Sequence, residues 1–296
     1  MTDHLVLDGV TRRFGSHTAL DDVSFTLPAG SICGLLGRNG AGKTTLLSLI
    51  AGQDLPSAGT VQVNGHSPFE HAPTLAGINL VRDNQRYPDD FTVGNVLSIA
   101  PRFLPHWDAD FAKRLVAGFR VPLNQSVKKF SRGQLSAVAI VLGLASRAPL
   151  TLMDEPYLGL DVNARRYFHE ALVRDVAEHP RTVILSTHHV EESESLFDRV
   201  LIVDSGRILL DANIDAIPEI AFTVSGRDDA IRELTAGLDV LRLQTVPGLA
   251  SATIRGSADD AFLARAEAAG ARIQGVSVAD LVTAFGSEST AEAVAA

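Results

Sequence analysis

The chain has 296 residues, of which 46% are hydrophobic and 21% are charged, and its formal net charge at pH 7 is −9. This length and apolar content allow a sizeable core and suggest two domains, or one large and one small, while the ordinary charge content excludes bulk disorder. The acidic balance argues against a dedicated nucleic-acid binder, because such proteins usually present a basic face.

Neither the start of the chain nor its longest apolar stretch predicts a membrane segment. The first five residues lack a basic region followed by an apolar one, so no signal peptide is expected. The apolar stretch over 135–153 is interrupted by Arg147 and Pro149, and it is too short and broken to span a bilayer. Cys33 is the only cysteine, which rules out an intramolecular disulfide and fits a reducing compartment. We therefore expect a protein that is soluble by itself.

Residues 1–215 alternate between predicted strands and helices, which indicates an α/β layer fold with a largely parallel central sheet. Apolar runs at 31–36, 150–153 and 182–185 predict buried strands. Shorter runs at 5–7, 23–27 and 60–63 alternate in part and predict an antiparallel flank on that sheet. Residues 91 to about 125 have a helical pattern and, with the apolar helix that follows, predict a helical insertion over about 91–145.

The pattern changes after residue 215. Strands are predicted at 220–224, 241–246, 250–254 and 272–276, and helices at 228–236 and 258–269. This β-α-β-β-α-β order is typical of a small ferredoxin-like α+β domain, here over 216–288. A last short helix is expected near Phe285, and residues 289–296 are predicted to form a flexible tail.

One motif in the first domain predicts a phosphate-binding loop. The pattern G-x-x-x-x-G-K-[ST] follows a predicted strand at 32–36 and precedes an apolar helix at 46–50. Its glycines let backbone N–H groups turn toward phosphate oxygens, Lys43 adds a positive charge, and Thr44 offers a hydroxyl to Mg²⁺. A chance match arises in roughly one chain of this size in a hundred. The candidate residues are Gly37, Arg38, Asn39, Gly40, Ala41, Gly42, Lys43, Thr44 and Thr45.

Two later strands end in residues suited to phosphate chemistry. Asp154 and Glu155 follow the apolar strand at 150–153. A carboxylate at the first position can hold Mg²⁺ through water, and one at the second can orient an attacking water. His188 ends the next predicted strand, within reach of a γ-phosphate. Each feature alone is common, so the prediction depends on their combination.

Two further segments lie where helices are predicted to begin. Ser131 and Gly133 precede the apolar helix at 135–145 and are able to donate to a phosphate, although a plain helix N-cap is the better interpretation of Ser131 in isolation. Asp161 ends a Gly-Leu-Asp segment shortly after Glu155.

The order and spacing of these segments resemble the ATP-binding cassette (ABC) ATPase family. Residues 37–45 look like its Walker A motif, 150–155 like its Walker B with the catalytic glutamate, and 130–134 like its signature, usually LSGGQ. Residues 159–161 look like its D-loop, and His188 like its switch histidine. The resemblance covers roughly the first 215 residues. It implies a P-loop NTPase fold and a site for ATP and Mg²⁺, to which it adds Phe14 as the residue that stacks on adenine, and Ser131, Gly133, Gln134 and Asp161 as nucleotide contacts.

The chain departs from the family pattern at two places. The signature has Phe130 and Arg132 where the family usually has leucine and glycine, while Ser131 and Gly133 are kept. The family also places a glutamine that senses Mg²⁺ before the helical insertion. Here Asp83 and Gln85 fit that position about equally, so both stay open.

The resemblance implies a function as well as a fold. Two such domains pack head to tail, so that ATP lies between the Walker A of one and the signature of the other. We expect the ATPase subunit of a membrane transporter with a separately encoded permease, peripheral to the cytoplasmic face of the membrane. The C-terminal β-α-β-β-α-β unit resembles an extension of bacterial exporter ATPases and favours export.

Two other functions are less favoured. A soluble ABC ATPase acting on ribosomes or nucleic acid is the alternative. However, translation-type members carry two cassettes, repair-type members carry a long heptad coiled coil, and the acidic charge does not suit direct nucleic-acid binding. A non-hydrolysing structural subunit is disfavoured because Lys43, Asp154, Glu155 and His188 are all present.

Overall fold

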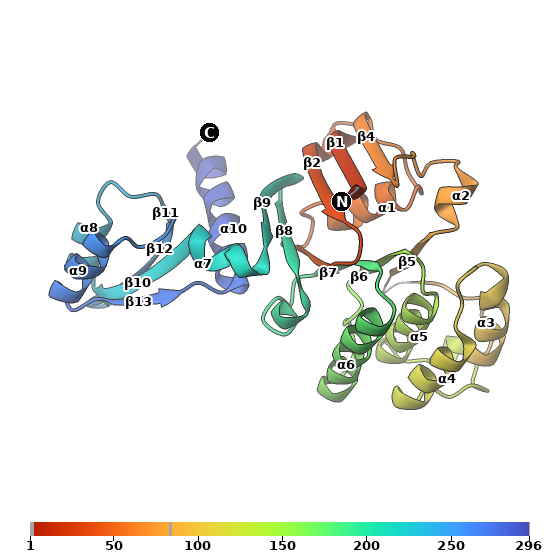
Figure 1. Ribbon diagram of the computed structural model, residues 1–296. Coiled ribbons are helices and arrows are strands. Elements are labelled where there is room, and N and C mark those ends of the chain that lie inside the picture. The colour runs from red at the N-terminus through yellow and green to blue at the C-terminus, as the bar shows by residue number, and fades with distance from the viewer. Residues whose placement is uncertain (1–2, 83–84, 296) are drawn as a thin grey trace.

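The computed structural model describes residues 3–82 and 85–295, and a six-stranded sheet forms its centre (Figure 1). The strand order is β5-β6-β7-β3-β8-β9, in which the first five strands are parallel and β9 is antiparallel to β8. Strands β3, β6 and β7 are buried at every position, as their continuous apolar runs predicted. The bounds are β3 Ile32–Leu36, β5 Ile78–Arg82, β6 Leu150–Asp154, β7 Thr182–Thr187, β8 Arg199–Asp204 and β9 Arg207–Asn213.

A three-stranded antiparallel sheet of order β2-β1-β4 flanks the central sheet, as expected. Its strands are β1 Asp3–Phe14, β2 His17–Pro28 and β4 Ala58–Val63. Helix α1, Lys43–Ile50, packs between the two sheets, and the short α2, Ala72–Leu75, precedes β5. The phosphate-loop motif therefore lies where β3 passes into α1.

The stretch from 91 to 145 is helical apart from its connecting loops. Figure 1 shows its helices on the side of the central sheet opposite to β1, β2 and β4, next to α6. Thr92 and Asp108 begin two of them as N-caps whose side chains accept backbone N–H groups. The elements of this stretch are α3 Val93–Ile99, η1 Ala100–Arg102, α4 Ala109–Gly118, η2 Val127–Lys129 and α5 Arg132–Ala145. Later in the chain come α6 Val162–Glu178 and η3 Glu194–Leu196.

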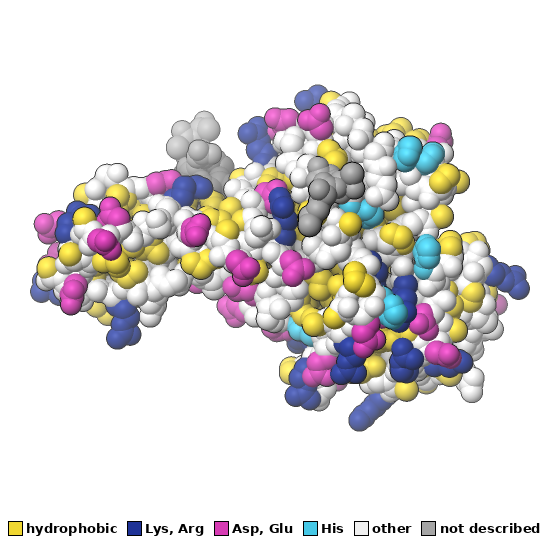
Figure 2. All heavy atoms as spheres, viewed as in Figure 1, with side chains coloured by type: hydrophobic (Ala, Val, Ile, Leu, Met, Phe, Trp, Pro, Cys, Tyr) yellow, Lys and Arg dark blue, Asp and Glu magenta, His cyan; other side chains and the backbone are white. Residues whose placement is uncertain are grey.

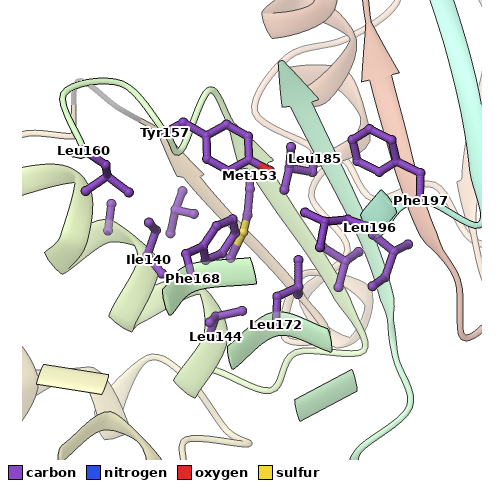
Figure 3. Close-up of a cluster of buried hydrophobic side chains, with 14 of the residues drawn as sticks. Ile140, Leu144, Met153, Tyr157, Leu160, Phe168, Leu172, Leu185, Leu196 and Phe197 are labelled. Atoms are coloured by element: carbon purple, nitrogen blue, oxygen red, sulfur yellow. The ribbon is translucent and has the colours of Figure 1, made fainter. Parts of the chain in front are cut away.

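The two faces of the central sheet pack into two separate apolar clusters, because successive side chains of a strand point to opposite faces. On β3, Ile32 and Leu36 join the cluster with α5 and α6, whereas Cys33 and Leu35 join the cluster with α1 and the antiparallel sheet. Figure 3 shows part of the first cluster, where side chains of α5 and α6 meet those of β6 and β7. Labelled there are Ile140, Leu144, Met153, Phe168, Leu172 and Leu185.

The C-terminal part holds a four-stranded antiparallel sheet of order β11-β12-β10-β13, with elements in the order β-α-β-β-α-β. Helices α8 and α9 pack on one of its faces and enclose a third apolar cluster. The elements are η4 Ile214–Ala216, α7 Ile217–Ile220, β10 Ala221–Arg227, α8 Asp228–Thr235, β11 Val240–Val246, β12 Leu249–Arg255, α9 Asp260–Ala268 and β13 Arg272–Gly275.

The final helix differs from the prediction. Helix α10 runs over Val278–Ala295, instead of a short helix near Phe285 followed by a flexible tail from 289. Alanine and glutamate, which recur after residue 286, are strong helix formers and favour this continuation. Across the described ranges, no helix combines the length and hydrophobicity that crossing a membrane requires.

Candidate nucleotide-binding site

The loop between β3 and α1 is confined by its neighbours at two glycines. Gly37 and Gly42 have φ angles of 149° and 108°, which L side chains rarely adopt. A Cβ at Gly37 would lie 2.1 Å from the carbonyl oxygen of Val203 on β8, and one at Gly42 would lie 2.7 Å from that of Ala19 on β2. The loop therefore needs glycine at both positions, for space as well as for conformation.

Lys43, the first residue of α1, points back into this loop. Its side chain is 6% exposed, and its Nζ donates to the carbonyl oxygens of Gly37 at 2.7 Å and Arg38 at 3.2 Å. The same Nζ lies 3.5 Å from Oε1 of Glu155. The ammonium group is thus held between the loop and the carboxylate that the sequence predicted to be catalytic.

Asp154 joins three elements at the carboxyl edge of the parallel strands. Its carboxylate is 5% exposed and accepts hydrogen bonds from Thr44 Oγ1 at 2.8 Å and from Ser186 Oγ at 2.6 Å. Mg²⁺ prefers oxygen ligands, and in nucleotide sites it is held by one or two carboxylates together with waters and substrate phosphates. The Thr44 hydroxyl and the Asp154 carboxylate fit such an ion, which when bound neutralises phosphate charge.

Glu155 is held in an unusual backbone conformation. Its φ angle is 50°, a left-handed value that costs about 1–3 kcal/mol for a non-glycine residue and persists where the surroundings impose it. Its N–H donates to Ser186, with 3.0 Å to Oγ and 3.2 Å to the carbonyl oxygen. Its Oε2 lies 2.9 Å from Nδ1 of His188, whereas its buried Oε1 has no hydrogen-bond partner. One carboxylate oxygen is thus oriented by His188, and the other lies beside Nζ of Lys43 and makes no hydrogen bond.

Lys43, Thr44, Asp154 and Glu155 line a cavity of about 310 Å³ together with Phe14, whereas His188 lies outside its lining. That volume lies at the lower end of the range for small-molecule sites. The Phe14 ring is half exposed, and the guanidinium of Arg12 lies 4.4 Å from its centroid. The remaining lining residues are His17, Ala19, Asn39, Gly40, Ala41, Gly42 and Thr45. The structure therefore brings the aromatic residue, the phosphate loop and both carboxylates to one place.

A second group of predicted site residues lies outside this cavity. Ser131 is the N-cap of α5, and its Oγ accepts from the N–H of Gln134 while the Gln134 side chain accepts from the N–H of Ser131. A Cβ at Gly133 would lie 2.2 Å from the carbonyl oxygen of Gly159. Asp161 caps α6 by accepting from Ala164. Among the residues that the structure describes, Ser131, Gly133, Gln134 and Asp161 do not line the cavity of the phosphate loop.

The predicted glutamine also lies apart from the metal ligands. Gln85 lines a different cavity, of about 260 Å³, with apolar residues of the helical insertion. It does not line the nucleotide cavity with Thr44 and Asp154. Asp83, the other candidate, lies outside the described residues.

Sequence reasoning did not assign three residues that the structure places in the site. Ser186 bonds both acidic residues, and it pairs with Asp154 in the register of β6 and β7. His17 and Ala19 line the cavity because the β1–β2 hairpin pairs His17 with Phe14. For Ser186, the available signal was a small hydroxyl residue near the end of a predicted strand. Recognising its role requires knowing that this strand, β7, lies next to β6 and its Asp154.

The fold and its phosphate loop define a P-loop ATP-binding domain, and comparison with known proteins agrees with this class. The family model described as "ABC transporter" matches residues 20–158. "Nod factor export ATP-binding protein I" of Rhizobium johnstonii is 31% identical over 219 residues, which cover 72% of this chain and 70% of that protein. The chain belongs to the ABC transporter family and contains its ATP-binding domain.

Other relatives carry names of both export and import proteins. "Nod factor export ATP-binding protein I" of Ralstonia nicotianae is 34% identical over 212 residues, which cover 70% of this chain and 66% of that protein. "Aliphatic sulfonates import ATP-binding protein SsuB" of Burkholderia ambifaria is 34% identical over 214 residues, which cover 72% of this chain and 65% of that protein. The chain thus matches slightly less than two thirds of the length of these two relatives.

Solved structures show the same fold. The structure titled "Structure of ATP binding subunit of ABC transporter" has a TM-score of 0.66 and 26% identity, and the match covers 73% of this chain and 92% of that one. A dimeric ATP-binding cassette bound to ADP and Pi has a TM-score of 0.62 at 20% identity, covering 71% of this chain and 98% of that chain.

Proposed function

We propose that this chain hydrolyses ATP as the ATPase subunit of a membrane transporter whose permease is a separate chain. The observation that carries the proposal is the environment of Glu155. One carboxylate oxygen is oriented by His188 at 2.9 Å, and the other lies 3.5 Å from Nζ of Lys43 with no hydrogen-bond partner. Once Lys43 turns to phosphate, a carboxylate oxygen that makes no hydrogen bond is suited to orient and polarise an attacking water.

The remaining cavity residues take roles that follow from their chemistry. Backbone N–H groups of the loop and the end of α1 bind phosphate oxygens. Lys43 then exchanges the carbonyl oxygens of Gly37 and Arg38 for phosphate oxygens. Thr44 and Asp154 hold Mg²⁺, and Phe14 stacks on the adenine on the side of its ring that Arg12 does not cover. His188 keeps the Glu155 side chain in place and reaches toward the γ-phosphate.

A second copy of the domain completes the site. The phosphate-loop cavity contains no residue of the signature segment, and Ser131 lies exposed at the N-terminus of α5. The positive end of a helix favours an anion. Ser131, Gly133, Gln134 and Asp161 of one subunit are thereby available to the ATP held by the other. Closure of the two excludes water and strengthens the electrostatic interactions of the site.

The permease docks on the apolar cavity between β5 and the helical insertion. This cavity of about 260 Å³ is lined by Asn79, Gln85 and mostly apolar residues such as Phe91, and Phe103 on its rim is 76% exposed. A large exposed aromatic residue beside an apolar cavity is typical of a protein-binding surface. Gln85 on its wall follows β5 by three residues, so it is placed between the docked segment and the sheet that carries Asp154. The subunit would then lie on the cytoplasmic face of the membrane.

The transporter is of the export type, and its C-terminal unit is a ferredoxin-like domain. The β-α-β-β-α-β order and the antiparallel sheet order β11-β12-β10-β13 support the second statement. The resemblance of this unit to the extension of bacterial exporter ATPases supports the first. On the face shown in Figure 2, acidic and basic side chains are interspersed, which favours a transporter role over nucleic-acid binding on that face.

The substitution Glu155→Gln tests the proposal. Because it removes the charge and keeps the shape, we expect ATP binding to persist, hydrolysis to fall by at least about 100-fold, and a dimer to accumulate with ATP on size-exclusion chromatography. Glu267→Gln, at an exposed position on α9, is the matched control and should turn over like the wild type. Ser131→Arg should prevent the dimer and leave ATP binding to the monomer unchanged. Unchanged turnover in Glu155→Gln would contradict the assignment.

A further inference from the structure

Helix α10 follows the C-terminal sheet in the chain, yet it packs against the central sheet of the ATP-binding domain. Leu281, Ala284 and Phe285 are buried in the same apolar cluster as Val200 and Ile202 of β8. Figure 1 shows α10 standing between the C-terminal sheet and the β8–β9 pair. The helix is therefore fixed relative to β8, whose Val203 carbonyl contacts the phosphate loop at Gly37.

At Gly286, the backbone of α10 meets the phosphate loop itself. Gly286 is buried, and a Cβ built on it would lie 3.4 Å from Cδ of Arg38. A real side chain at this position would start in contact with Arg38, and a larger one would have to displace it. Glycine thus allows the helix backbone to lie directly against the aliphatic part of the Arg38 side chain.

The first residue of α10 contacts the other side of the site. The N–H of Val278 donates to Oε1 of Glu194 at 3.2 Å. Glu194 begins η3, and the residue before it, Ser193, donates its hydroxyl to the carbonyl oxygen of His189 at 3.2 Å. The same helix therefore contacts the phosphate loop and the segment that follows the switch histidine, His188.

A movement of Arg38 would reach Lys43 through the backbone. The Arg38 carbonyl oxygen accepts from Nζ of Lys43 and from the N–H of Ala41, both at 3.2 Å. Gly37, on the other side, lies close to β8, since a Cβ built on it would be 2.1 Å from the carbonyl oxygen of Val203. A displacement of the Arg38 backbone would therefore move the carbonyl oxygen of Arg38, which is one of the two that Nζ of Lys43 releases when it binds phosphate.

We infer that α10 is a positioning element of the nucleotide site, which acts through the contact of Gly286 with Arg38. The helix keeps Arg38 where its carbonyl holds Lys43 ready for exchange, and it thereby sets nucleotide affinity from the C-terminal part of the chain. Gly286 and Glu194 are positioning residues that touch no nucleotide. This inference rests on the proposed function, in which the phosphate loop holds ATP.

Substitution of Gly286 by leucine in the full chain tests the inference. The leucine side chain would displace Arg38, so we expect the Kd for ADP with Mg²⁺, measured by calorimetry, to rise at least about fivefold. The kcat at saturating ATP should stay within about twofold of the wild type, since the carboxylates are untouched. Gly275→Leu is the matched control, because Gly275 on β13 has no atom within 4 Å of its Cβ position and its φ is ordinary.

A double-mutant cycle separates positioning from a general loss of structure. In an Arg38→Ala background, the Cδ atom of Arg38 is gone and there is nothing for Gly286→Leu to displace. The substitution should then no longer weaken ADP binding. The unmodified protein gives a second measurement. Coupling is reciprocal, so ADP binding must change hydrogen exchange at the amides of 278–286.

Three outcomes would overturn the inference. The first is equal Kd values for folded Gly286→Leu and Gly275→Leu, and the second is the same loss of affinity from Gly286→Leu in the Arg38→Ala background. The third is hydrogen exchange in α10 that ADP does not change. A wild-type chain that binds no nucleotide would instead overturn the proposed function, and the inference with it.

Discussion

Ser186 lies between the two acidic residues of the site and bonds both. Its hydroxyl donates to Asp154 at 2.6 Å and accepts from the N–H of Glu155 at 3.0 Å. It thereby fixes the carboxylate that fits Mg²⁺ and supports the left-handed backbone of the proposed catalytic residue. Ser186 contacts neither phosphate nor the attacking water, but it orients Asp154 and Glu155, which are proposed to act on Mg²⁺ and on that water.

Ser186→Ala is expected to lower ATP turnover by about 10–100-fold, the usual cost of losing a group that orients a metal ligand. The Mg²⁺ concentration needed for half-maximal activity should rise, because Asp154 loses one of its two partners. Steady-state ATPase assays across a Mg²⁺ titration measure both effects. Ser98→Ala is the control, since Ser98 is exposed on α3 and its hydroxyl donates to the carbonyl oxygen of Asn95. Equal turnover in the two variants would show that Ser186 has no such role.

The contrast between Ser186 and Lys43 shows how far the sequence determines the site. Lys43 and Thr44 lie within one contiguous motif whose conformation is local, so spacing alone predicts their proximity. Asp154 and Glu155 were predicted because they end a recognisable apolar strand. Ser186 enters the site through the register of two strands 32 residues apart, which no local pattern encodes.

The start of α5 and the loop after Glu155 behave as one structural element. The hydroxyl of buried Ser136 donates to the carbonyl oxygen of Leu158 at 2.5 Å, and Gly133 packs directly on Gly159. Burial raises the pKa of Tyr157 in the same loop, so its phenol stays neutral. Arg132 takes part with its first side-chain carbon, because a Cβ built on Gly159 would lie 3.2 Å from the Cβ of Arg132, while the residue as a whole is exposed.

Gly133→Ala is expected to separate these two segments. The added Cβ would lie 2.2 Å from a backbone oxygen, so we expect a loss of about 1–3 kcal/mol in stability and a lower ATPase rate. Thermal unfolding together with the ATPase assay tests this. Gly94→Ala, also in the first turn of a helix but with its nearest atom at 3.4 Å, should change both far less. A Gly133→Ala variant as stable and active as Gly94→Ala would contradict the close packing.

The sequence predicts an element well when its pattern also shows which faces of that element are buried. Continuous apolar runs predicted β3, β6 and β7, because a strand covered on both faces has no polar side. Helix α10 was predicted too short, because the residues after 286 have no apolar periodicity and continue as a helix through propensity. The packing of α10 on β8 was also not predictable, since this contact joins segments about 80 residues apart in the chain.

At the scale of the whole molecule, α10 joins the C-terminal unit to the ATP-binding domain. Leu281 is fully buried in the cluster shared with β8, and Leu241 of β11 belongs to the same cluster. Arg255 of β12 lies over the ring of Phe285, with its guanidinium 5.2 Å from the centroid. Both parts of the chain therefore pack on one helix.

Leu281→Ala is expected to destabilise the whole protein by about 2–5 kcal/mol, the cost of a cavity in a packed core. Urea denaturation followed by circular dichroism measures this loss. Leu243→Ala is the control, because Leu243 on β11 is 42% exposed and its truncation should cost little. If the two variants lose equal stability, α10 does not hold the two parts together.

The place of α10 in the chain has a consequence for biosynthesis. A ribosome makes the phosphate loop before α10, which follows every other described element, and domains generally fold from the N-terminus during synthesis. A nascent chain that stops before residue 278 would already contain every motif of the family and still lack the helix that braces Arg38. Interrupted translation would thus yield fragments that carry the family motifs but whose phosphate loop lacks the contact between Arg38 and α10.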